Sequence, residues 1–230
     1  MINHYPVECQ NCFFKTTICK TLSEHELNHL HKPTKHRKFH KGEVIFKQGE
    51  KTEFLVYLTK GMAKLVHNNH GKNLILTIEK SQTLLGLSNI IINENVNLSS
   101  IVAIEDSKGC IIDIELFMET MFKNRQFMLA VLGISTLMFR RSITNFISIA
   151  HKQSNGRIAD ILIFFAETIY QNHSFYLSLS RQELAEFAGC SKEAIIRVFQ
   201  RFSTDGILRI SGKKVEILDM ERLHQVSRTG

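Results

Sequence analysis

The hydrophobic pattern of the chain changes twice, and the changes divide it into three parts. Residues 22–113 contain short β-branched and aromatic runs such as VIF, FLVYL and LILTI, separated by turn residues at Gly49, Gly61 and Asn69 to Gly71. Strands of this length with turns between them are typical of a small antiparallel barrel or sandwich. The sequence therefore predicts a β-domain in this part of the chain.

A helical period begins at Ile114. Apolar and small residues recur three and four positions apart and form a near-heptad seam along one long helix. The seam consists of Met128, Leu132, Ser135, Phe139, Ile143, Phe146 and Ala150. It offers more apolar surface than one wall of a barrel needs, so we expect it to pair with a second copy of the chain. The QSNG segment, Gln153 to Gly156, is the predicted hinge to the last domain.

The last part of the chain has the pattern of two short helices joined by a tight turn. Ser180 and Glu183 form a capping box for the first helix, Gly189 allows the turn, and Ser191 can cap the second helix. The inward positions of the second helix are Ile195, Val198, Phe199 and Phe202, which leaves Lys192, Glu193, Ile196, Arg197 and Gln200 on the outside. This arrangement predicts a helix-turn-helix.

The outward residues suit the base-pair edges of a major groove. Arg197 can donate two hydrogen bonds to guanine, Glu193 can accept from cytosine, and Ile196 can contact a thymine methyl group. Lys192 can bind guanine or phosphate. The hairpin RISGKKVEI predicts a wing whose tip, with Lys213, lies near phosphates. The alternative is an amphipathic helix whose charges are only solvated, and the wing argues against it.

Composition narrows the class of protein. A chain of 230 residues with 43% hydrophobic residues is long enough for two domains, and its formal net charge of +7 favours polyanionic partners, although weakly. Residues 1–20 contain no apolar run of the length of an export signal, and the longest apolar stretch, 127–139, looks too short for a bilayer. We expect a cytoplasmic protein with no membrane partner. The chain shows no Ser-His-Asp order, phosphate loop or paired carboxylates, so we expect no enzyme activity.

Four cysteines could form one ligand set. Cys9, Cys12 and Cys19 stand in a short basic arm, and Cys110 follows much later. In a reducing compartment such thiols indicate metal or redox chemistry before disulfides. Four thiolates suit an iron–sulfur cluster or zinc, and the absence of a second close cysteine pair favours iron. Cys190 lies in the helix-turn-helix turn, where we expect an ordinary small buried thiol. The eleven histidines show no periodic pairing and are expected to be solvated.

With these motifs in view, the chain resembles the Crp/Fnr family of bacterial transcription regulators. KGEVIFKQGE and YLTKGMAKLV resemble its sensor domain, and SRQELAEFAGCSKEAIIRVFQRF resembles its winged helix. The resemblance implies an α+β fold with four parts. They are a cysteine-rich arm (1–21), a double-stranded β-helix or jelly-roll sensor like that of cyclic nucleotide-binding proteins (22–113), a long dimerisation helix (114–152) and a winged helix-turn-helix DNA-binding domain (153–230).

The resemblance also implies a function. The family regulates transcription as homodimers on palindromic double-stranded operator DNA, whose half-sites lie about one helical turn apart, and RNA polymerase is an implied partner. The implied phosphate contacts are Ser180, Gln182 and Ser191, and the implied readers of a G·C pair are Glu193 and Arg197. Ile196 departs from the small or hydroxyl residue usual at its position, so contacts to the neighbouring base pair are not carried over.

The implied signal depends on the sensor. Cyclic nucleotide-binding members carry a Glu and an Arg-Ser pair where this chain has Leu87 and Ser99–Ser100, so cyclic AMP is not expected. The cysteines resemble those of the oxygen-sensing iron–sulfur branch, the fumarate and nitrate reduction regulators, with one extra residue between Cys12 and Cys19. This implies a 4Fe-4S cluster, sensitive to oxygen or nitric oxide, on Cys9, Cys12, Cys19 and Cys110. The alternative is a regulator of the same family that senses a small ligand or haem in the β-roll, while the arm binds zinc or nothing.

Overall fold

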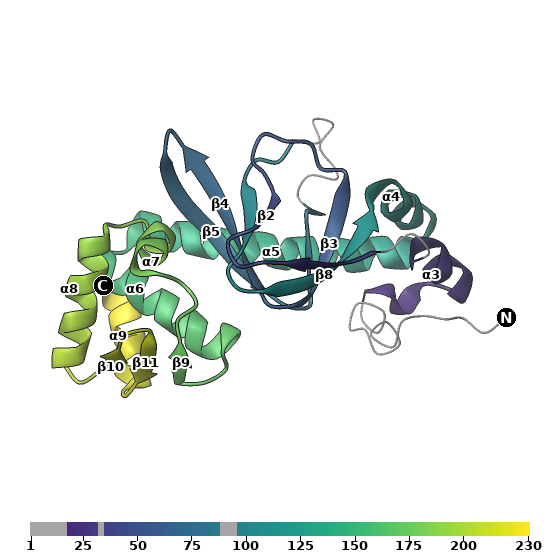
Figure 1. The fold of residues 1–230 in the computed structure, drawn as a ribbon. Helices are drawn as coiled ribbons and strands as arrows, with labels where there is room; N and C mark the ends of the chain where they lie inside the picture. Colours follow the sequence, from purple (N-terminus) through teal and green to yellow (C-terminus); the bar gives the residue numbers. More distant parts are fainter. Residues whose placement is uncertain (1–17, 32–34, 88–95) are drawn as a thin grey trace. The chain divides into compact units, whose positions relative to one another are not determined.

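The structure is a computed structural model and describes residues 18–31, 35–87 and 96–230. The chain forms two compact units, one of residues 1–63 and 79–140 and the other of residues 64–78 and 141–230. Most of the hairpin of β4 (Met62–Asn69) and β5 (Lys72–Lys80) belongs to the second unit. Figure 1 shows the helices and strands of both units.

Two four-stranded sheets form the predicted β-domain. The first has the order β1–β8–β3–β6, with bounds β1 (Lys35–Phe39), β8 (Ser107–Asp113), β3 (Phe54–Lys60) and β6 (Thr83–Leu85), and its pairs are antiparallel. The second has the order β2–β7–β4–β5, with β2 (Val44–Phe46) and β7 (Ser100–Ala103). Antiparallel sheets, a long helix and a C-terminal helical domain confirm the predicted α+β fold.

Strand β3 shows why its sequence is a continuous apolar run rather than an alternating one. Successive side chains of a strand point to opposite faces. Leu55 and Tyr57 enter a cluster shared with helices on one side of the sheet, while Val56 and Leu58 are buried on the other side. The strand is therefore covered on both faces, which a run of buried apolar residues requires.

Residues 22–31 form a helix, not the strands expected for this part of the chain. Helix α3 (Glu24–His31) follows the single turn η1 (Cys19–Thr21) and packs beside α4 (Ile114–Lys123) (Figure 1). Ser23 and Glu26 bond each other in capping-box fashion, with the Glu26 carboxylate accepting from the Ser23 backbone at 2.7 Å. Leu27 and Leu30 bury one face of α3. A Ser-x-x-Glu signal followed by leucines three apart could have predicted this helix.

The predicted dimerisation helix, 114–152, consists of two helices. Helix α4 ends at Asn124, whose φ of −119° and ψ of 102° are extended. The Asn124 side chain then accepts a hydrogen bond of 3.0 Å from the Phe127 backbone and caps α5 (Arg125–His151). Helix α5 is long and apolar enough to cross a membrane by length and composition, and little of it is buried. The apolar stretch 127–139 is therefore one part of a longer helix of apolar character.

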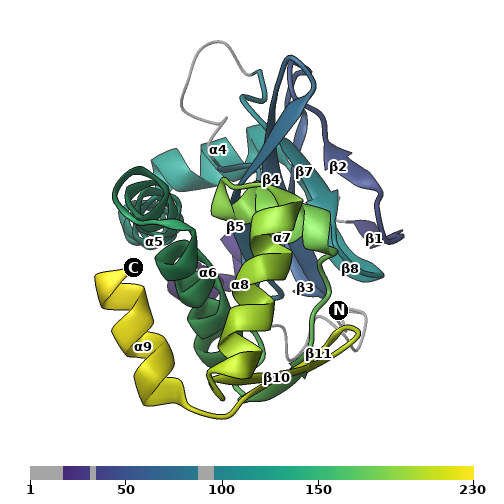
Figure 2. The same cartoon turned by 90° about the vertical axis from the view of Figure 1, so that its left-hand side faces the viewer.

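The second unit contains the predicted winged helix (Figure 2). Its elements are α6 (Ser154–Ile163), the π-helical turn η3 (Phe164–Ile169), β9 (Ser174–Tyr176), α7 (Arg181–Ala188), α8 (Lys192–Thr204), β10 (Leu208–Ser211), β11 (Lys214–Ile217) and α9 (Met220–Thr229). The sheet order is β10–β11–β9. The chain breaks before α6 at Gln153, as the hinge prediction required, but Gly156 is helical. A Cβ atom on Gly156 would lie 2.5 Å from the Gly230 carbonyl oxygen, so this glycine permits close packing.

Candidate DNA-binding surface and cysteine region

Helix α7 begins and ends as the sequence predicts. The Ser180 hydroxyl accepts a hydrogen bond of 3.2 Å from the Glu183 backbone, and the Glu183 carboxylate accepts one of 2.7 Å from the Ser180 backbone. Gly189 ends the helix with a φ of 58°, a conformation that glycine adopts at little cost. Its missing Cβ would meet the Ile149 side chain of α5 at 3.1 Å. The turn before α8 is therefore fixed by both backbone conformation and packing.

Helix α8 separates buried from exposed residues as predicted. The Ser191 hydroxyl accepts from the Ala194 backbone at 3.2 Å and caps the helix. The inward residues Ile195, Val198, Phe199 and Phe202 are buried, whereas Lys192, Glu193, Ile196, Arg197 and Gln200 are exposed. Gln182 is exposed on α7. Ser180 and Ser191 act as acceptors in their caps, and their hydroxyl groups also donate to the Glu183 and Glu193 carboxylates. A phosphate would have to replace these carboxylates as the acceptor.

Glu193 and Arg197 lie four residues apart and therefore on one face of α8. Hydrogen bonds from the Glu193 backbone N–H and from the Ser191 hydroxyl lower the pKa of the Glu193 carboxyl. The side chain is thus a carboxylate at neutral pH and can only accept hydrogen bonds. An acceptor and a guanidinium side by side match the amino group of cytosine and the acceptor atoms of guanine.

The wing is a hairpin of β10 and β11 with Gly212 and Lys213 at its tip. Gly212 has a φ of 59°, which lets two residues close the turn. The Lys213 carbonyl accepts a hydrogen bond of 2.9 Å from the Leu177 backbone, and the Gly212 carbonyl accepts one of 2.9 Å from Nη2 of Arg181. The Lys213 side chain is exposed. Sequence reasoning missed Arg181, because helical periodicity does not show that its side chain reaches the wing.

A second arginine missed by sequence reasoning is Arg157 of α6. Its Nε donates to the Lys152 carbonyl at 2.9 Å, just after α5 ends. Its Nη1 donates to the carbonyls of Ala188 and Gly189 at 3.1 and 2.8 Å. These acceptors include the last carbonyls of α7, which have no partner within that helix. Arg157 therefore joins the end of α5 to the helix-turn-helix turn.

Asp160 reinforces the same junction. Its carboxylate accepts hydrogen bonds of 2.5 Å from the Ser148 hydroxyl and 2.8 Å from the Lys152 ammonium. The Ser227 hydroxyl of α9 donates to it at 2.5 Å. The last turn of α5, the middle of α6 and the end of α9 are held by one half-buried carboxylate.

Two of the four predicted cluster ligands, Cys9 and Cys12, lie outside the described residues. The other two, Cys19 in η1 and Cys110 in β8, are 1% and 6% exposed and belong to one apolar cluster. That cluster also contains Phe127 and Val131 of α5 and residues of α3, α4, β3 and β6. Neither cysteine is in a disulfide, nor is Cys190, which is half-buried.

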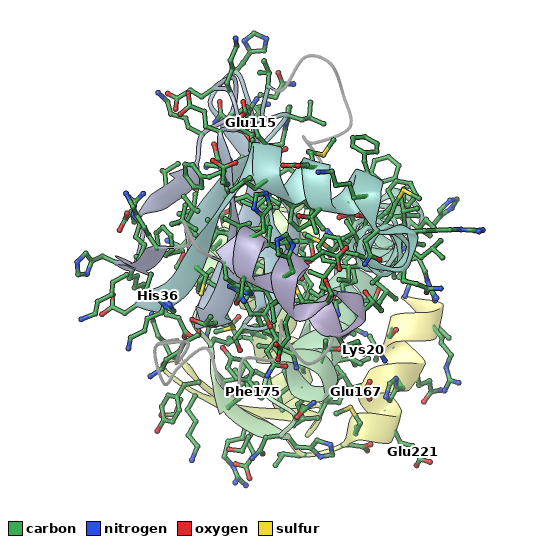
Figure 3. All side chains as sticks on the ribbon, turned by 90° about the vertical axis from the view of Figure 1, so that its right-hand side faces the viewer. Lys20, His36, Glu115, Glu167, Phe175 and Glu221 are labelled. Carbon is green, nitrogen blue, oxygen red and sulfur yellow. The ribbon has the colours of Figure 1, made fainter. Side chains whose placement is uncertain are left out.

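His36 lies directly opposite Cys110, because the two residues are paired across β1 and β8. Its Nδ1 atom is 3.7 Å from the Cys110 Sγ atom. Figure 3 shows His36 on the edge strand, with Lys20 of η1 on another side of the same unit. Within the described ranges no three His, Cys, Asp or Glu side chains are placed to hold a metal ion. The sequence predicted solvated histidines. The contact between His36 and Cys110 follows from the register of β1 against β8, which the sequence does not show.

Family comparisons cover most of the chain. The cyclic nucleotide-binding domain matches residues 36–124, and the Crp-like helix-turn-helix domain matches residues 156–226. The chain belongs to the Crp/Fnr family of transcription regulators. As the sequence predicted, its relatives are regulators of transcription and not enzymes.

Two relatives cover almost the full length of this Crp/Fnr regulator. It is 25% identical to the transcriptional activator protein Anr of Pseudomonas protegens over 224 residues, which is 94% of this chain and 91% of Anr. It is 24% identical to the fumarate and nitrate reduction regulatory protein of Yersinia pestis over 230 residues, 97% of this chain and 91% of the relative. The solved structure of FixK2 from Bradyrhizobium japonicum has the same fold, with a TM-score of 0.77 and 16% identity over 86% of this chain and 98% of FixK2.

One sequence segment of the β-roll of this Crp/Fnr regulator has no basic residues. Leu87 and Ser99, at the positions expected for ligand contacts, are buried at 5% and 6% exposure. No lysine, arginine or histidine occurs in the sequence between Ser81 and Lys108. This segment has no cation that could neutralise a cyclic phosphate.

Proposed function

We propose that this Crp/Fnr regulator is a cytoplasmic homodimer that binds palindromic operator DNA under the control of an oxygen- or nitric oxide-sensitive 4Fe-4S cluster. The observation that carries the proposal is the burial of Cys19 and Cys110 in one apolar cluster with Phe127 and Val131. The fold thus places Cys19 and Cys110, which are far apart in the sequence, in the same cluster as Phe127 and Val131 near the beginning of α5. A change at these thiols has a direct route to the long helix.

Binding to DNA is supported by the exposed face of α8 and by the wing. Glu193 and Arg197 would contact a G·C pair, and Lys192 and Ile196 would contact adjacent bases or phosphates. Phosphate contacts would come from Ser180, Gln182, Ser191 and Lys213. RNA polymerase is a further partner that membership of the family implies.

Dimerisation is supported by the exposed apolar surface of α5. Its large exposed side chains are Leu129, Leu132, Leu137, Phe139, Ile143, Phe146 and Ile147. Phe139 and Phe146 are 65% and 61% exposed. Large exposed apolar side chains in this number on one helix indicate an interaction site. Arg140 and Arg141, both exposed at mid-helix, would be costly in a bilayer. They favour a second copy of the helix over a membrane as the partner.

The cluster would be held by Cys9, Cys12, Cys19 and Cys110, whose thiolates are the ligands that 4Fe-4S clusters take. When bound, it would supply an iron–sulfur group that oxygen or nitric oxide destroys. Cys19 and Cys110 lie in apolar surroundings, which limit the access of water to a group bound there. The packing of α3, α4 and α5 around them would respond to the loss of that group.

The test is the absorption spectrum, with iron, sulfide and zinc content, of protein purified without oxygen and then exposed to air. About four irons and four sulfides per chain, with visible absorption that bleaches in air, would support the cluster. Zinc or no metal in a colourless protein would contradict it. That result would favour the second candidate function, a regulator that senses a small ligand or haem in the β-roll.

A further inference from the structure

Arg181 joins three parts of the winged helix. It is the first residue of α7, directly after the capping residue Ser180. Its guanidinium carbon lies 4.5 Å from the centre of the Phe199 ring, which belongs to the buried face of α8. Its Nη2 atom donates to the Gly212 carbonyl at the wing tip, at 2.9 Å. One side chain thus contacts both the recognition helix and the wing.

The wing tip is held by two adjacent carbonyl groups. The Lys213 carbonyl bonds the Leu177 backbone within the β-sheet region, so it depends on no side chain. The Gly212 carbonyl bonds only Arg181 among the hydrogen bonds of the described residues. Residues 212 and 213 form the turn between the paired residues Ser211 and Lys214. Loss of the Arg181 contact would remove the hydrogen bond to the Gly212 carbonyl and leave the one to the Lys213 carbonyl in place.

The guanidinium group of Arg181 contacts protein groups, the Phe199 ring and the Gly212 carbonyl. The side chain is half-buried, and this burial lowers the pKa of its guanidinium. Within the described part of the chain, no carboxylate forms a salt bridge with it. A planar guanidinium that stacks on a ring and donates to a carbonyl holds both groups in a defined geometry, which a lysine ammonium does not.

We propose that Arg181 is a positioning residue that sets the wing tip relative to α8, so that Lys213 and Lys214 bind phosphate while α8 binds base edges. The inference rests on the DNA-binding surface proposed above. Lys213 and Lys214 are exposed, and they immediately follow the carbonyl that Arg181 holds. Arg181 acts on DNA through these lysines.

The experiment measures operator affinity against salt concentration for full-length protein kept without oxygen, on a duplex selected from random DNA by the wild type. The variants are Arg181→Lys, the pair Lys213→Ala and Lys214→Ala, and all three substitutions together. Each phosphate contact contributes about 0.9 to the salt slope. We expect Arg181→Lys to reduce the slope by about 0.9 to 1.8 and to weaken binding about tenfold at 0.1 M salt. Discrimination against an operator with one changed G·C pair should stay the same.

The combined variant decides the role of Arg181. Without the wing lysines, Arg181→Lys should change affinity by less than about twofold, because the two effects share a cause. An equal loss in both backgrounds would overturn the proposal, since Arg181 would then contact phosphate itself or support folding generally. Arg201→Lys, an exposed change on α8, is the matched control, and melting curves check folding. A wild type that binds no duplex would overturn the proposed function, whereas an unchanged slope for Arg181→Lys would overturn only this inference.

Discussion

The Nη1 atom of Arg157 donates a hydrogen bond of 2.8 Å to the carbonyl oxygen of Gly189, the glycine that ends α7. The same side chain bonds the Lys152 carbonyl just beyond α5. The end of the long helix and the turn before the recognition helix therefore share one guanidinium. A movement of α5 would displace this turn, which makes the contact a route from the proposed dimer helix to the DNA-binding surface.

Replacing Arg157 should weaken both folding and DNA binding. Arg157→Gln removes hydrogen bonds to carbonyl groups at the end of α7, and we expect a loss of about 1 to 3 kcal/mol in the free energy of unfolding. Denaturant unfolding measures it. Arg222, whose Nη1 donates to the exposed Asp205 carbonyl at 2.8 Å, provides a control. A loss for Arg222→Gln as large as that for Arg157→Gln would contradict the special role of the α5 junction.

The recognition helix should control which bases are bound. Arg197→Ala should relax the preference at one base pair of each half-site by about 1 to 3 kcal/mol. Binding selection from a randomised operator measures this preference. A variant that keeps the full preference would show that Arg197 does not contact a base.

The wing should control affinity without sequence preference. Lys213→Ala should weaken binding to all duplexes alike and reduce the salt slope by about 0.9, as expected for one lost phosphate contact. Titrations at several salt concentrations, on the selected operator and on an unrelated duplex, test this. Loss of discrimination between the two duplexes would contradict a pure phosphate contact.

The pH dependence of stability should include Glu183. Burial alone would raise the pKa of its carboxyl, but hydrogen bonds from Lys64, at 2.8 Å, and from Ser180 outweigh burial and lower the pKa below its usual value of 4.5. Its folded pKa is therefore below its unfolded pKa. The stabilisation is complete above the unfolded pKa and is lost as pH falls through the folded pKa.

Glu183→Gln should remove this part of the acid response. Near neutral pH the variant should be less stable than the wild type by about 1 to 2 kcal/mol, because a hydrogen-bonded charge is lost. The difference should shrink as pH falls through the acid range. Chemical unfolding at a series of pH values measures it, and Glu186→Gln, a nearby change on the same helix, is the control. A difference that stays constant with pH would contradict the assignment to Glu183.

The apolar face of α5 should hold the dimer together. Phe139→Asp places two carboxylates in the interface of a symmetric dimer, and we expect the dissociation constant to rise at least about a hundredfold. Thr144→Asp adds the same charge away from the seam and should have little effect. Sedimentation velocity separates the two states. A wild type that is monomeric in buffer but binds lipid vesicles would contradict the dimer and favour a membrane partner.

Much of this fold follows from sequence periodicity, while the contacts between elements do not. Capping residues and apolar spacing specified α7, α8 and the wing because these signals are local. The sequence prediction missed helix α3, because its Ser23–Glu26 capping signal is short and is followed closely by the β-rich runs of the sensor domain. The sequence prediction also missed the division of residues 114–152 into two helices, because a single capping residue, Asn124, marks the break. Arg157, Arg181 and His36 could not be assigned, because their partners are brought close only by tertiary packing.

Replacement of Cys110 and replacement of Cys190 should differ in their effect on iron content. Cys110→Ser removes a proposed ligand and should lower the iron content of anaerobically purified protein at least tenfold, about the range seen when a metal site loses a supporting group. Cys190→Ser, in the turn before α8, should leave iron content unchanged. Elemental analysis measures both. Equal iron in the Cys110 variant and the wild type would exclude Cys110 as a ligand.

The central claim is that the state of the cysteine region controls DNA binding. The most direct measurement is the operator affinity of one anaerobic sample, recorded with its visible spectrum before and after exposure to air. The account predicts that visible absorption and operator affinity are lost together, and that the Cys110→Ser variant binds weakly in both conditions. Unchanged affinity after complete bleaching, or strong binding by a colourless protein in both conditions, would contradict it.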